Sequence, residues 1–397
     1  SAKWGVQIAG MIFQTRSSIP KEYMDFWIID YYFPPNSFDE NSPNCPFAVI
    51  WQPKALEKKQ FVKLSKANQI AESIARFRKA VTNDAPTYDL EEELYRLLVE
   101  PLIRREPLMK TAKNFIICPE GEVTTVPFDL LFGTDCRILY APFPDYIFAK
   151  SAPSSGPAAI CTNPVVTSKN AFGLSPLYDC EQECSVVTSA LQQAGYKTHI
   201  FYGDGNGDAL PFEKYTLLDK LNTENYSVIH ISTHGFYLQQ KTPKTPAFLS
   251  ADNSMQNPMH RCGLILNDSI CDGQYNTANS VLWGEDILRT DLTGTKLAIL
   301  SCCVSGLGYM ESGNWLVGLQ RAFFIAGVEN LIVSLWEVDE KATSILMQYF
   351  YQNMCAGQPA DLALQQAKNS LKAYKYGIYS TPYYWAGFIY IGKIFMI

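Results

Sequence analysis

Hydrophobic residues along this chain follow two periods, and their order predicts a protein built from both strands and helices. In the first third, β-branched and aromatic runs predict strands, whereas apolar residues at intervals of three and four predict helices. The order is a strand pair, two helices and two further strands, at residues 23–33, 47–51, 63–81, 89–103, 114–121 and 137–143. Pro, Ser and Gly then fill residues 151–157, which we interpret as a linker between two parts.

After this linker, apolar strands alternate with helical segments to the end of the chain. The predicted strands are at 158–164, 198–203, 226–232, 296–302, 330–336 and 383–392. The predicted helices are at 181–195, 211–222, 318–327 and 342–354. Such alternation is typical of an α/β fold with a mostly parallel sheet flanked by helices. We therefore predict an N-terminal supporting α/β half at 1–151 and a C-terminal domain at 152–397.

Composition and charge exclude several classes of function. The 397 residues are 47% hydrophobic and 18% charged, with no long apolar run, so no membrane span is expected. The net charge of -6, without a basic stripe, argues against direct nucleic-acid binding. The eleven cysteines show no CxxC pair, and neither GxxxxGKS nor HExxH occurs, so we expect no metal or other cofactor. Reduced thiols favour a cytoplasmic location.

The chain begins at Ser1, without an initiator Met and without the basic and apolar regions of a signal peptide. We expect that the natural protein carries a further region upstream of this residue.

Two predicted strands end in reactive side chains. The strand at 226–232 leads into His234, and the strand at 296–302 leads into Cys303. If these strands are parallel neighbours, both side chains lie at one edge of the sheet, where sites on such sheets are found. An imidazole can take the thiol proton, and the N–H of Gly235, which has no Cβ, is open to a substrate carbonyl. We expect the N–H groups of Gly235 and Cys303 to hold the oxyanion.

Several segments resemble one family. The segments VIHISTHGF, KLAILSCCVSGLG, GLQRAFFIAGVENLIVSLWEVDEKAT and TPYYWAGFIYIG are similar to the CHAT family, the caspase-like peptidases that are related to separase and often joined to tetratricopeptide repeats. The resemblance covers about residues 85–395 and implies a caspase-like fold with an inactive supporting half. It also implies a cysteine endopeptidase acting on a protein or peptide, with His234 and Cys303 as its dyad. Because such domains usually sit behind a sensing region, we expect a regulatory partner or upstream helical repeats to gate the activity.

In a caspase-like fold, the segment at the carboxyl end of the strand at 330–336 builds the main specificity pocket. Here it contains Trp336, Glu337 and Asp339, which we predict to bind substrate. Glu337 and Asp339 would attract a basic side chain, as separase-like relatives prefer. One alternative is structural, with Trp336 as a packing residue and the acids at the start of a helix. In another, the acids cap the helix and leave a pocket lined by Trp336 and apolar neighbours, which would select a Leu-like side chain. We also interpret the long polar segment at 239–280 as a specificity loop.

Two other functions remain open at this stage. The fold can serve as a catalytically idle scaffold, or Cys303 can act in a different acyl-transfer enzyme such as a transpeptidase or amidase. Cys302, directly before Cys303, is a second thiol that can compete for the role of nucleophile, although the register of the family motif favours Cys303.

Overall fold

The computed structural model describes residues 19–34, 45–55, 58–162, 177–205, 207–237, 257–267, 270–271, 274–275, 277–302 and 318–396. The described residues form two compact units. The first unit holds the residues up to Ser151 together with Thr381–Ile394, and the second begins at Ala152 and holds the rest. The predicted division at residue 151 matches the boundary between the units, except that Thr381–Ile394 belongs to the first unit. Whether the two units are separate domains stays a prediction.

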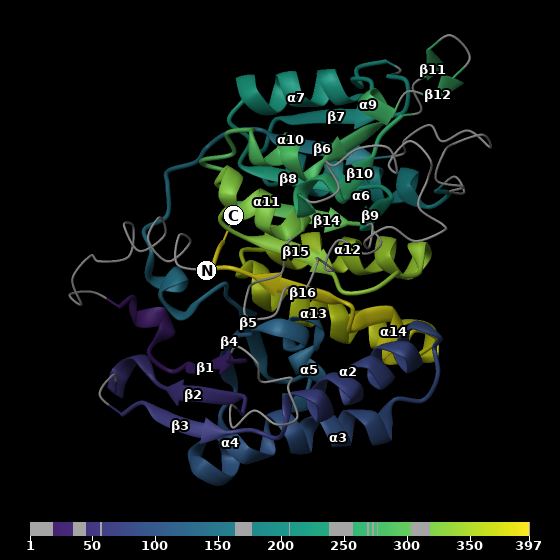
Figure 1. The fold of residues 1–397 in the computed structure, drawn as a ribbon. Helices are drawn as coiled ribbons and strands as arrows, with labels where there is room; N and C mark the ends of the chain where they lie inside the picture. The colour runs from purple at the N-terminus through teal and green to yellow at the C-terminus, as the bar shows by residue number, and fades with distance from the viewer. Residues whose placement is uncertain are drawn as a thin grey trace. The chain divides into compact units, whose positions relative to one another are not determined.

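The first unit contains a mixed sheet with helices (Figure 1). Its strands, in the order β3-β2-β1-β4-β5-β16, are β3 (Gln60–Lys63), β2 (Phe47–Trp51), β1 (Trp27–Tyr32), β4 (Asn114–Cys118), β5 (Arg137–Tyr140) and β16 (Phe388–Ile391). β1 pairs antiparallel with β2, as the predicted strand pair requires, and parallel with β4. β16 belongs here because Ile391 pairs with Tyr140 of β5.

The helices of the first unit form because apolar residues recur on one face. They are α2 (Ala67–Thr82), α3 (Tyr88–Leu98), α4 (Glu100–Arg105), α5 (Phe128–Phe132) and α14 (Pro382–Trp385). Ile70, Ile74 and Phe77 of α2 are all buried, at the spacing that predicted this helix. Pro101 stands in the first turn of α4, where its missing N–H costs nothing, and α3 ends just before it.

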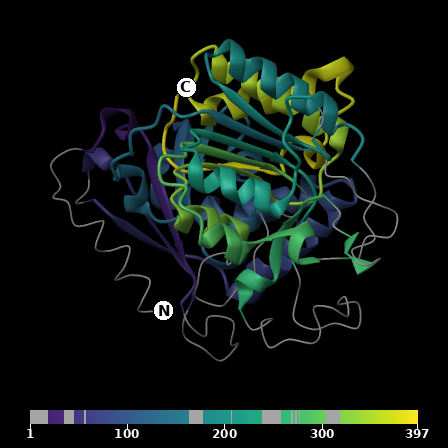
Figure 2. The same cartoon turned by 90° about the horizontal axis from the view of Figure 1, so that it is seen from above.

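The second unit contains a parallel sheet whose strands are almost continuously apolar. Their order is β15-β14-β8-β6-β7, with β15 (Leu331–Ser334), β14 (Leu297–Ser301), β8 (Val228–Ser232), β6 (Ala158–Thr162) and β7 (Thr198–Tyr202). Every residue of β6, β8, β14 and β15 is buried. Such burial is expected for parallel strands covered on both faces, and helices do cover both faces of this sheet (Figure 2).

The helices of the second unit include those that the sequence predicted. They are α6 (Cys180–Gln193), α7 (Lys214–Thr223), α9 (Thr277–Ser280), α10 (Gly284–Leu288), α11 (Leu319–Ala326), α12 (Glu340–Cys355) and α13 (Ala360–Ala373). The unit also contains a small antiparallel sheet of order β13-β10-β9, with β13 (Val281–Trp283), β10 (Cys262–Ile265) and β9 (Gly235–Tyr237), and a pair formed by β11 (Ile270–Cys271) and β12 (Gln274–Tyr275).

Candidate active site

The strands that carry the predicted dyad are direct neighbours and run parallel. β8 and β14 pair in register from Leu297 opposite Val228 to Ser301 opposite Ser232. Both strands therefore end at the same edge of the second unit's sheet, which is the condition on which the sequence-based argument depended. His234 follows Ser232 by two residues, and Cys303 follows Ser301 by two residues. Cys303 lies outside the described residues, so its predicted role stays a prediction.

The chain around His234 is fixed by β10. The Thr233 hydroxyl donates a hydrogen bond of 2.5 Å to the carbonyl of Ile265, and both groups are buried. The Ile265 N–H in turn donates to the carbonyl of His234 at 2.8 Å. His234 itself is half-buried. Two contacts with one residue therefore set the direction in which the chain leaves β8.

Gly235 begins β9, and the register of its pairing shows where its backbone points. Gly235 lies opposite Leu264 of β10. The bond from Ile265 N–H to the His234 carbonyl makes Gly235 and Leu264 a pair without mutual hydrogen bonds. In such a pair the N–H groups point away from the partner strand. Within the described residues β9 pairs with β10 alone, so the Gly235 N–H is directed to the open side of β9.

The small sheet that holds β9 is tightly packed. Phe236 and Trp283 meet edge to face with their ring centroids 5.3 Å apart, against the buried Ile265 and Val281. Gly263 lies beneath them, and a Cβ there would come within 2.9 Å of a Val281 methyl carbon and 3.0 Å of the Phe236 ring. The close approach of these side chains therefore requires glycine at position 263.

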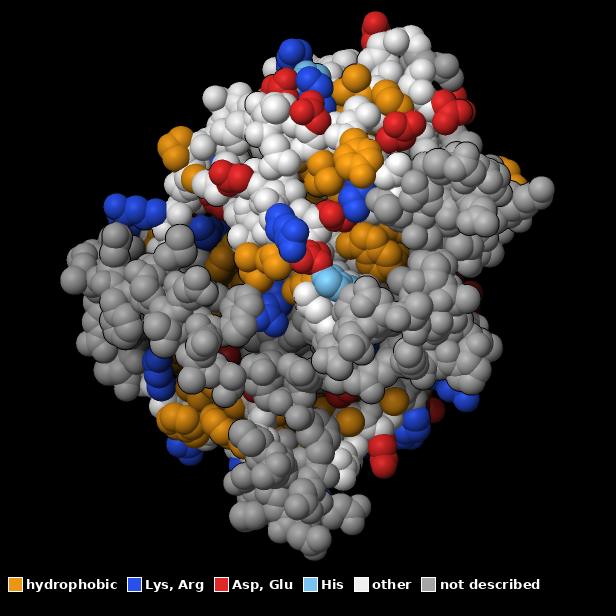
Figure 3. Space-filling view, turned by 45° about the horizontal axis from the view of Figure 1, so that its top comes forward, with side chains coloured by type: hydrophobic (Ala, Val, Ile, Leu, Met, Phe, Trp, Pro, Cys, Tyr) orange, Lys and Arg blue, Asp and Glu red, His pale blue; other side chains and the backbone are white. Residues whose placement is uncertain are grey.

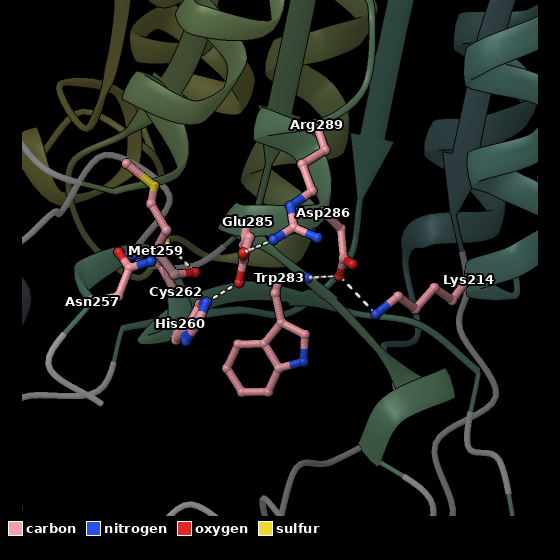
Figure 4. A network of polar contacts seen from close by, with 9 residues as sticks. All are labelled: Lys214, Asn257, Met259, His260, Cys262, Trp283, Glu285, Asp286 and Arg289. Carbon is pink, nitrogen blue, oxygen red and sulfur yellow. Dashed lines mark hydrogen bonds and ion pairs between the residues drawn. The ribbon is translucent and has the colours of Figure 1, made fainter. Parts of the chain in front are cut away.

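Ion pairs join the elements beside this sheet (Figure 4). Glu285 of α10 accepts from Arg289 one turn later and from His260, which ends the short helix η7 (Pro258–His260). Asp286 accepts from the Trp283 N–H at 2.9 Å and pairs with Lys214 of α7 at 2.7 Å. Carboxylates in the first turn of a helix are favoured by its dipole. These contacts hold η7, α7 and α10 around β10 and β13.

The end of β14 is held from the opposite side. The Ser334 hydroxyl, at the end of β15, donates a hydrogen bond of 2.5 Å to the carbonyl of Cys302. Cys302 is 3% exposed and Ser334 is 0% exposed. The thiol that competes with Cys303 in the sequence is thus buried at the strand end.

Most other described thiols are unsuited to act as nucleophiles. Burial raises the pKa of Cys180 to about 11 and that of Cys262 to about 12. Burial also raises the pKa of Cys118, Cys161 and Cys355. Because the thiolate is the reactive form, a raised pKa makes a cysteine a poor nucleophile at neutral pH.

The predicted substrate-binding residues do not share one environment. Trp336 is 1% exposed, so it packs in the core, while Glu337 is exposed. Asp339 is the N-cap of α12, and its carboxylate accepts from the Ala342 N–H at 2.8 Å. β15 ends at Ser334 and the chain bends at the next two residues, so Trp336 is not part of the strand. The role of these residues in binding stays a prediction.

A buried polar network lies directly behind the end of β8. The carboxylate of Glu183, on α6, is 2.9 Å from His230 Nε2 and accepts from the Ser232 hydroxyl at 2.9 Å. His230 Nδ1 is 3.1 Å from the Tyr351 hydroxyl. His230 is 0% exposed, so it packs in the core as a residue of β8.

Sequence reasoning missed Glu183, although the chain carries a signal for it. Glu183 stands among Cys180, Cys184 and Val187 on the buried face of α6. A carboxylate on the apolar stripe of a helix needs buried partners, because an unpaired buried charge is costly.

The charge distribution offers no single-sign surface on the face that Figure 3 shows. Described Lys and Arg side chains there are interspersed with Asp and Glu. Within the described ranges, His, Cys, Asp and Glu side chains form no group of three that can hold a metal ion. In the same ranges, none of the helices has the length and apolar character needed to cross a membrane.

Comparison with known proteins extends these observations. The family model described as CHAT domain matches residues 89–393, and a family of unknown function, DUF6783, matches residues 1–24. Tetratricopeptide repeat protein 28 of Homo sapiens is 25% identical over 335 residues, which are 76% of this chain and 13% of that protein. Its Mus musculus counterpart is 33% identical over 113 residues, 28% of this chain and 4% of that protein. The chain thus spans a small part of these relatives.

A solved structure has a similar fold. The separase-securin complex of Saccharomyces cerevisiae matches 99% of this chain and 31% of its own chain, with a TM-score of 0.57 and 10% identity. Together with the mostly parallel, helix-flanked sheet, this confirms the predicted caspase-like α/β fold.

Proposed function

This chain belongs to the CHAT domain family, and we propose that it is a cysteine endopeptidase with Cys303 as nucleophile and His234 as general base. The observation that carries the proposal is the register of β8 and β14. Ser232 lies opposite Ser301, and the two reactive residues follow at the same interval on neighbouring strands. A parallel pair brings such positions to one edge of the sheet.

The proposed reaction uses groups at the two strand ends. His234 takes the thiol proton of Cys303, and the thiolate attacks the scissile carbonyl carbon, whose oxygen becomes an oxyanion held by the N–H groups of Gly235 and Cys303. The C–N bond then breaks, and the amine leaves with the proton from His234. Water adds to the thioester, the acid product leaves, and the Cys303 thiol is restored. The direction of the Gly235 N–H, away from β10, supports its part in this scheme.

The dyad can be tested without knowing the natural substrate. A peptidyl acyloxymethyl ketone should alkylate the wild type at Cys303, and His234→Ala and Cys303→Ala should lose the adduct while remaining folded. Cys302→Ala is the matched control, because Cys302 is buried and should leave labelling and cleavage largely intact. Labelling that survives in Cys303→Ala but disappears in Cys302→Ala would overturn the assignment. A scaffold would form no adduct with any of the four proteins.

Hydrolysis is distinguished from other acyl transfer by the products. A peptidase should release a free carboxylate from a cleaved peptide, even when an amine nucleophile is added in excess. Formation of a new amide as the main product would instead identify a transpeptidase.

We also propose that the peptidase is gated by a region or partner outside this chain, and that it acts in the cytoplasm on a protein substrate. Relatives named for tetratricopeptide repeats extend far beyond the matched segment, and the separase structure is a complex with securin. Cleavage rates of the full-length protein with and without candidate partners test the gating. Equal rates under all conditions would contradict it.

A further inference from the structure

A row of aromatic side chains crosses the three outer strands of the first unit's sheet. Tyr32 of β1 lies opposite Phe47 of β2, and Val49, two residues after Phe47, lies opposite Phe61 of β3. The Tyr32 and Phe47 rings are stacked with their centroids 5.0 Å apart, and the Phe61 centroid is 6.0 Å from that of Phe47. Phe61 is 68% exposed and Tyr32 is 41% exposed. These three rings, which we call the aromatic row, therefore present an apolar surface on one face of the sheet.

β3 is the outermost strand of this sheet, and half of its backbone groups face away from β2 (Figure 1). The N–H of Leu64 donates to the carbonyl of Pro46 at 2.9 Å, so every second residue of β3, counted back from Leu64, bonds to β2. The residues between these positions, Phe61 and Lys63, direct their N–H and C=O groups to the open edge. In the part of the chain that the structure describes, β3 pairs with β2 alone. An extended segment can add to such an edge as a further strand.

Lysines flank the exposed ring on this edge. Phe61 and Lys63 lie on the same face of β3, because side chains alternate along a strand, and both are exposed. Lys59, directly before β3, is also exposed, and its ammonium lies 4.6 Å from the centroid of the Trp51 ring of β2. Trp51 lies on the same face of β2 as Phe47, so Lys59 belongs to the face of the aromatic row. An apolar ring between two cations attracts a segment with acidic residues on either side of an apolar one.

Protection of the edge does not explain this pattern. Lysines on an edge strand hinder pairing with another chain, and this accounts for Lys59 and Lys63. It does not account for Phe61 between them, because an exposed aromatic residue at the centre of an edge favours pairing. The lysines also argue against a second copy of this chain. In an antiparallel pair centred on Phe61, Lys59 of one copy would face Lys63 of the other, and like charges directly opposite each other are destabilising.

We propose that β3 and the aromatic row form a docking site for an extended acidic segment of a partner protein, which adds to the sheet as a strand antiparallel to β3. Acidic residues of this segment lie opposite Lys59 and Lys63, and an apolar residue lies opposite Phe61. Helical repeats, which are expected upstream of this chain, cannot supply the segment, because a helix uses its backbone groups internally. Single-stranded nucleic acid fits less well, since bases stack on open ring faces and the stacked rings of Tyr32 and Phe47 each cover a face of the other.

The first test uses a fluorescently labelled probe peptide, Ser-Glu-Thr-Phe-Thr-Glu-Ser, with blocked ends. Its two Glu and its Phe occupy alternate positions and so share one face of an extended strand. We expect saturable binding to this chain by fluorescence anisotropy, with a Kd below about 1 mM. Phe61→Thr, which keeps a residue that favours strands, should weaken binding about 3 to 10 times. Lys59→Glu combined with Lys63→Glu should weaken it about tenfold or more. Tyr88→Ser is the matched control, because Tyr88 is an exposed aromatic residue of the same unit, on α3, and it should leave binding unchanged.

A second comparison distinguishes strand addition from general attraction between charges, and it uses the unaltered protein. In an antiparallel strand the N–H of the probe's Phe donates to β3, whereas the N–H of the Thr that follows points away from it. N-methylation of the Phe should therefore weaken binding about tenfold, and N-methylation of that Thr should change it less than about threefold.

The outcomes are independent of the dyad, because they measure binding and not cleavage. The inference is overturned if the probe shows no saturable binding, if Phe61→Thr binds it as well as the wild type, or if both N-methylated peptides bind equally. Binding of oligouridylate in place of the probe would identify a nucleic-acid site instead, and a dimer that sedimentation shows to depend on Phe61 would identify a second copy as the occupant. A natural full-length protein that fails to bind the probe, when this chain binds it, would show that the protein's own upstream region fills the site.

Discussion

Replacing Glu183 with Ala should destabilise the second unit strongly, although Glu183 is not part of the proposed dyad. Its carboxylate accepts from His230 Nε2 and from the Ser232 hydroxyl, each at 2.9 Å, and all three groups are buried. A carboxylate only accepts hydrogen bonds, so the ring nitrogen of His230 that faces Glu183 carries the hydrogen, while the other ring nitrogen lies 3.1 Å from the Tyr351 hydroxyl. The variant leaves two buried donors without an acceptor.

The expected magnitude follows from these two orphaned groups. A buried donor left unsatisfied costs about 1–3 kcal/mol, so the variant should lose about 2–6 kcal/mol. Glu181→Ala is the control on the same helix, because Glu181 is exposed in the first turn of α6. Losing its interaction with the helix dipole should cost about 0.3–1 kcal/mol.

The assay should resolve one unit from the other, because a chain with two units need not unfold in a single step. Amide hydrogen exchange of β8 and α6, read by mass spectrometry, reports the local free energy of opening. Peptides from β1 and β4 in the first unit, measured in the same experiment, serve as an internal reference. A loss below about 1 kcal/mol in Glu183→Ala, or one equal to that of Glu181→Ala, would refute the reasoning.

Three further predictions concern other parts of the chain. Burial raises the pKa of Asp30 from its ordinary value of 3.8 to about 7, so the folded first unit holds a proton that the unfolded chain releases, and its stability should fall between about pH 4 and 7 and then level off. Asp30→Asn should remove this loss of stability, which amounts to about 4 kcal/mol at pH 8. The control Asp25→Asn, at an exposed site, should leave the pH dependence unchanged. Urea denaturation measures the stability, and equal pH profiles of Asp30→Asn and wild type would contradict the prediction. Asp339→Asn should keep the helix cap, because Asn caps as well as Asp, while Asp339→Ala should lose about 1 kcal/mol of stability in thermal denaturation. Cleavage of a peptide library then tests the charge. If Asp339→Asn loses a preference for basic residues, the charge acts in substrate binding, whereas an unchanged preference would exclude that role. Gly263→Ala should push the side chains of Phe236 and Val281 aside and lower the melting temperature. A variant as stable as wild type would show that these side chains move at little cost.

The sequence predicted the strands of the second unit well, because strands that are buried on both faces consist of continuous runs of apolar residues. The segments that became β6, β8, β14 and β15 needed no other signal, and their order along the chain implied a parallel sheet. The order of the strands in the sheet did not follow from the sequence. The sequence alone therefore could not show that β8 and β14 are neighbours. β3 and α13 were not predicted. In β3, four residues with a single buried side chain give too little pattern to identify a strand.

Predictions about the site were limited by side chains that act on the backbone. Asp339 reads equally well as a pocket residue or a cap, and only the bond to Ala342 distinguishes the two. Ser334 and Thr233 carry no signature, because a hydroxyl that bonds to a distant carbonyl depends on which strands become neighbours. Residues 239–256, the first part of the predicted loop at 239–280, lie outside the described part of the chain. The later part is not a simple loop, because it contains η7, β10, β11, β12 and α9, and its specificity role stays a prediction.

The two strand ends at the proposed site are each held by one hydrogen bond from a hydroxyl to a backbone carbonyl. Packing on both faces fixes β8 and β14 up to Ser232 and Ser301, but beyond these residues the ladder between them ends. One hydroxyl then takes over on each side: Thr233 donates to Ile265, and Ser334 donates to Cys302. Each bond orients a single peptide unit rather than a strand, and a net contribution of about 1 kcal/mol suffices for that. The two contacts lie on different strands and share no partner. If the proposed dyad forms at these strand ends, removing both hydroxyls should lower adduct formation by the product of the single effects, whereas a larger combined loss would show that the two strand ends are coupled.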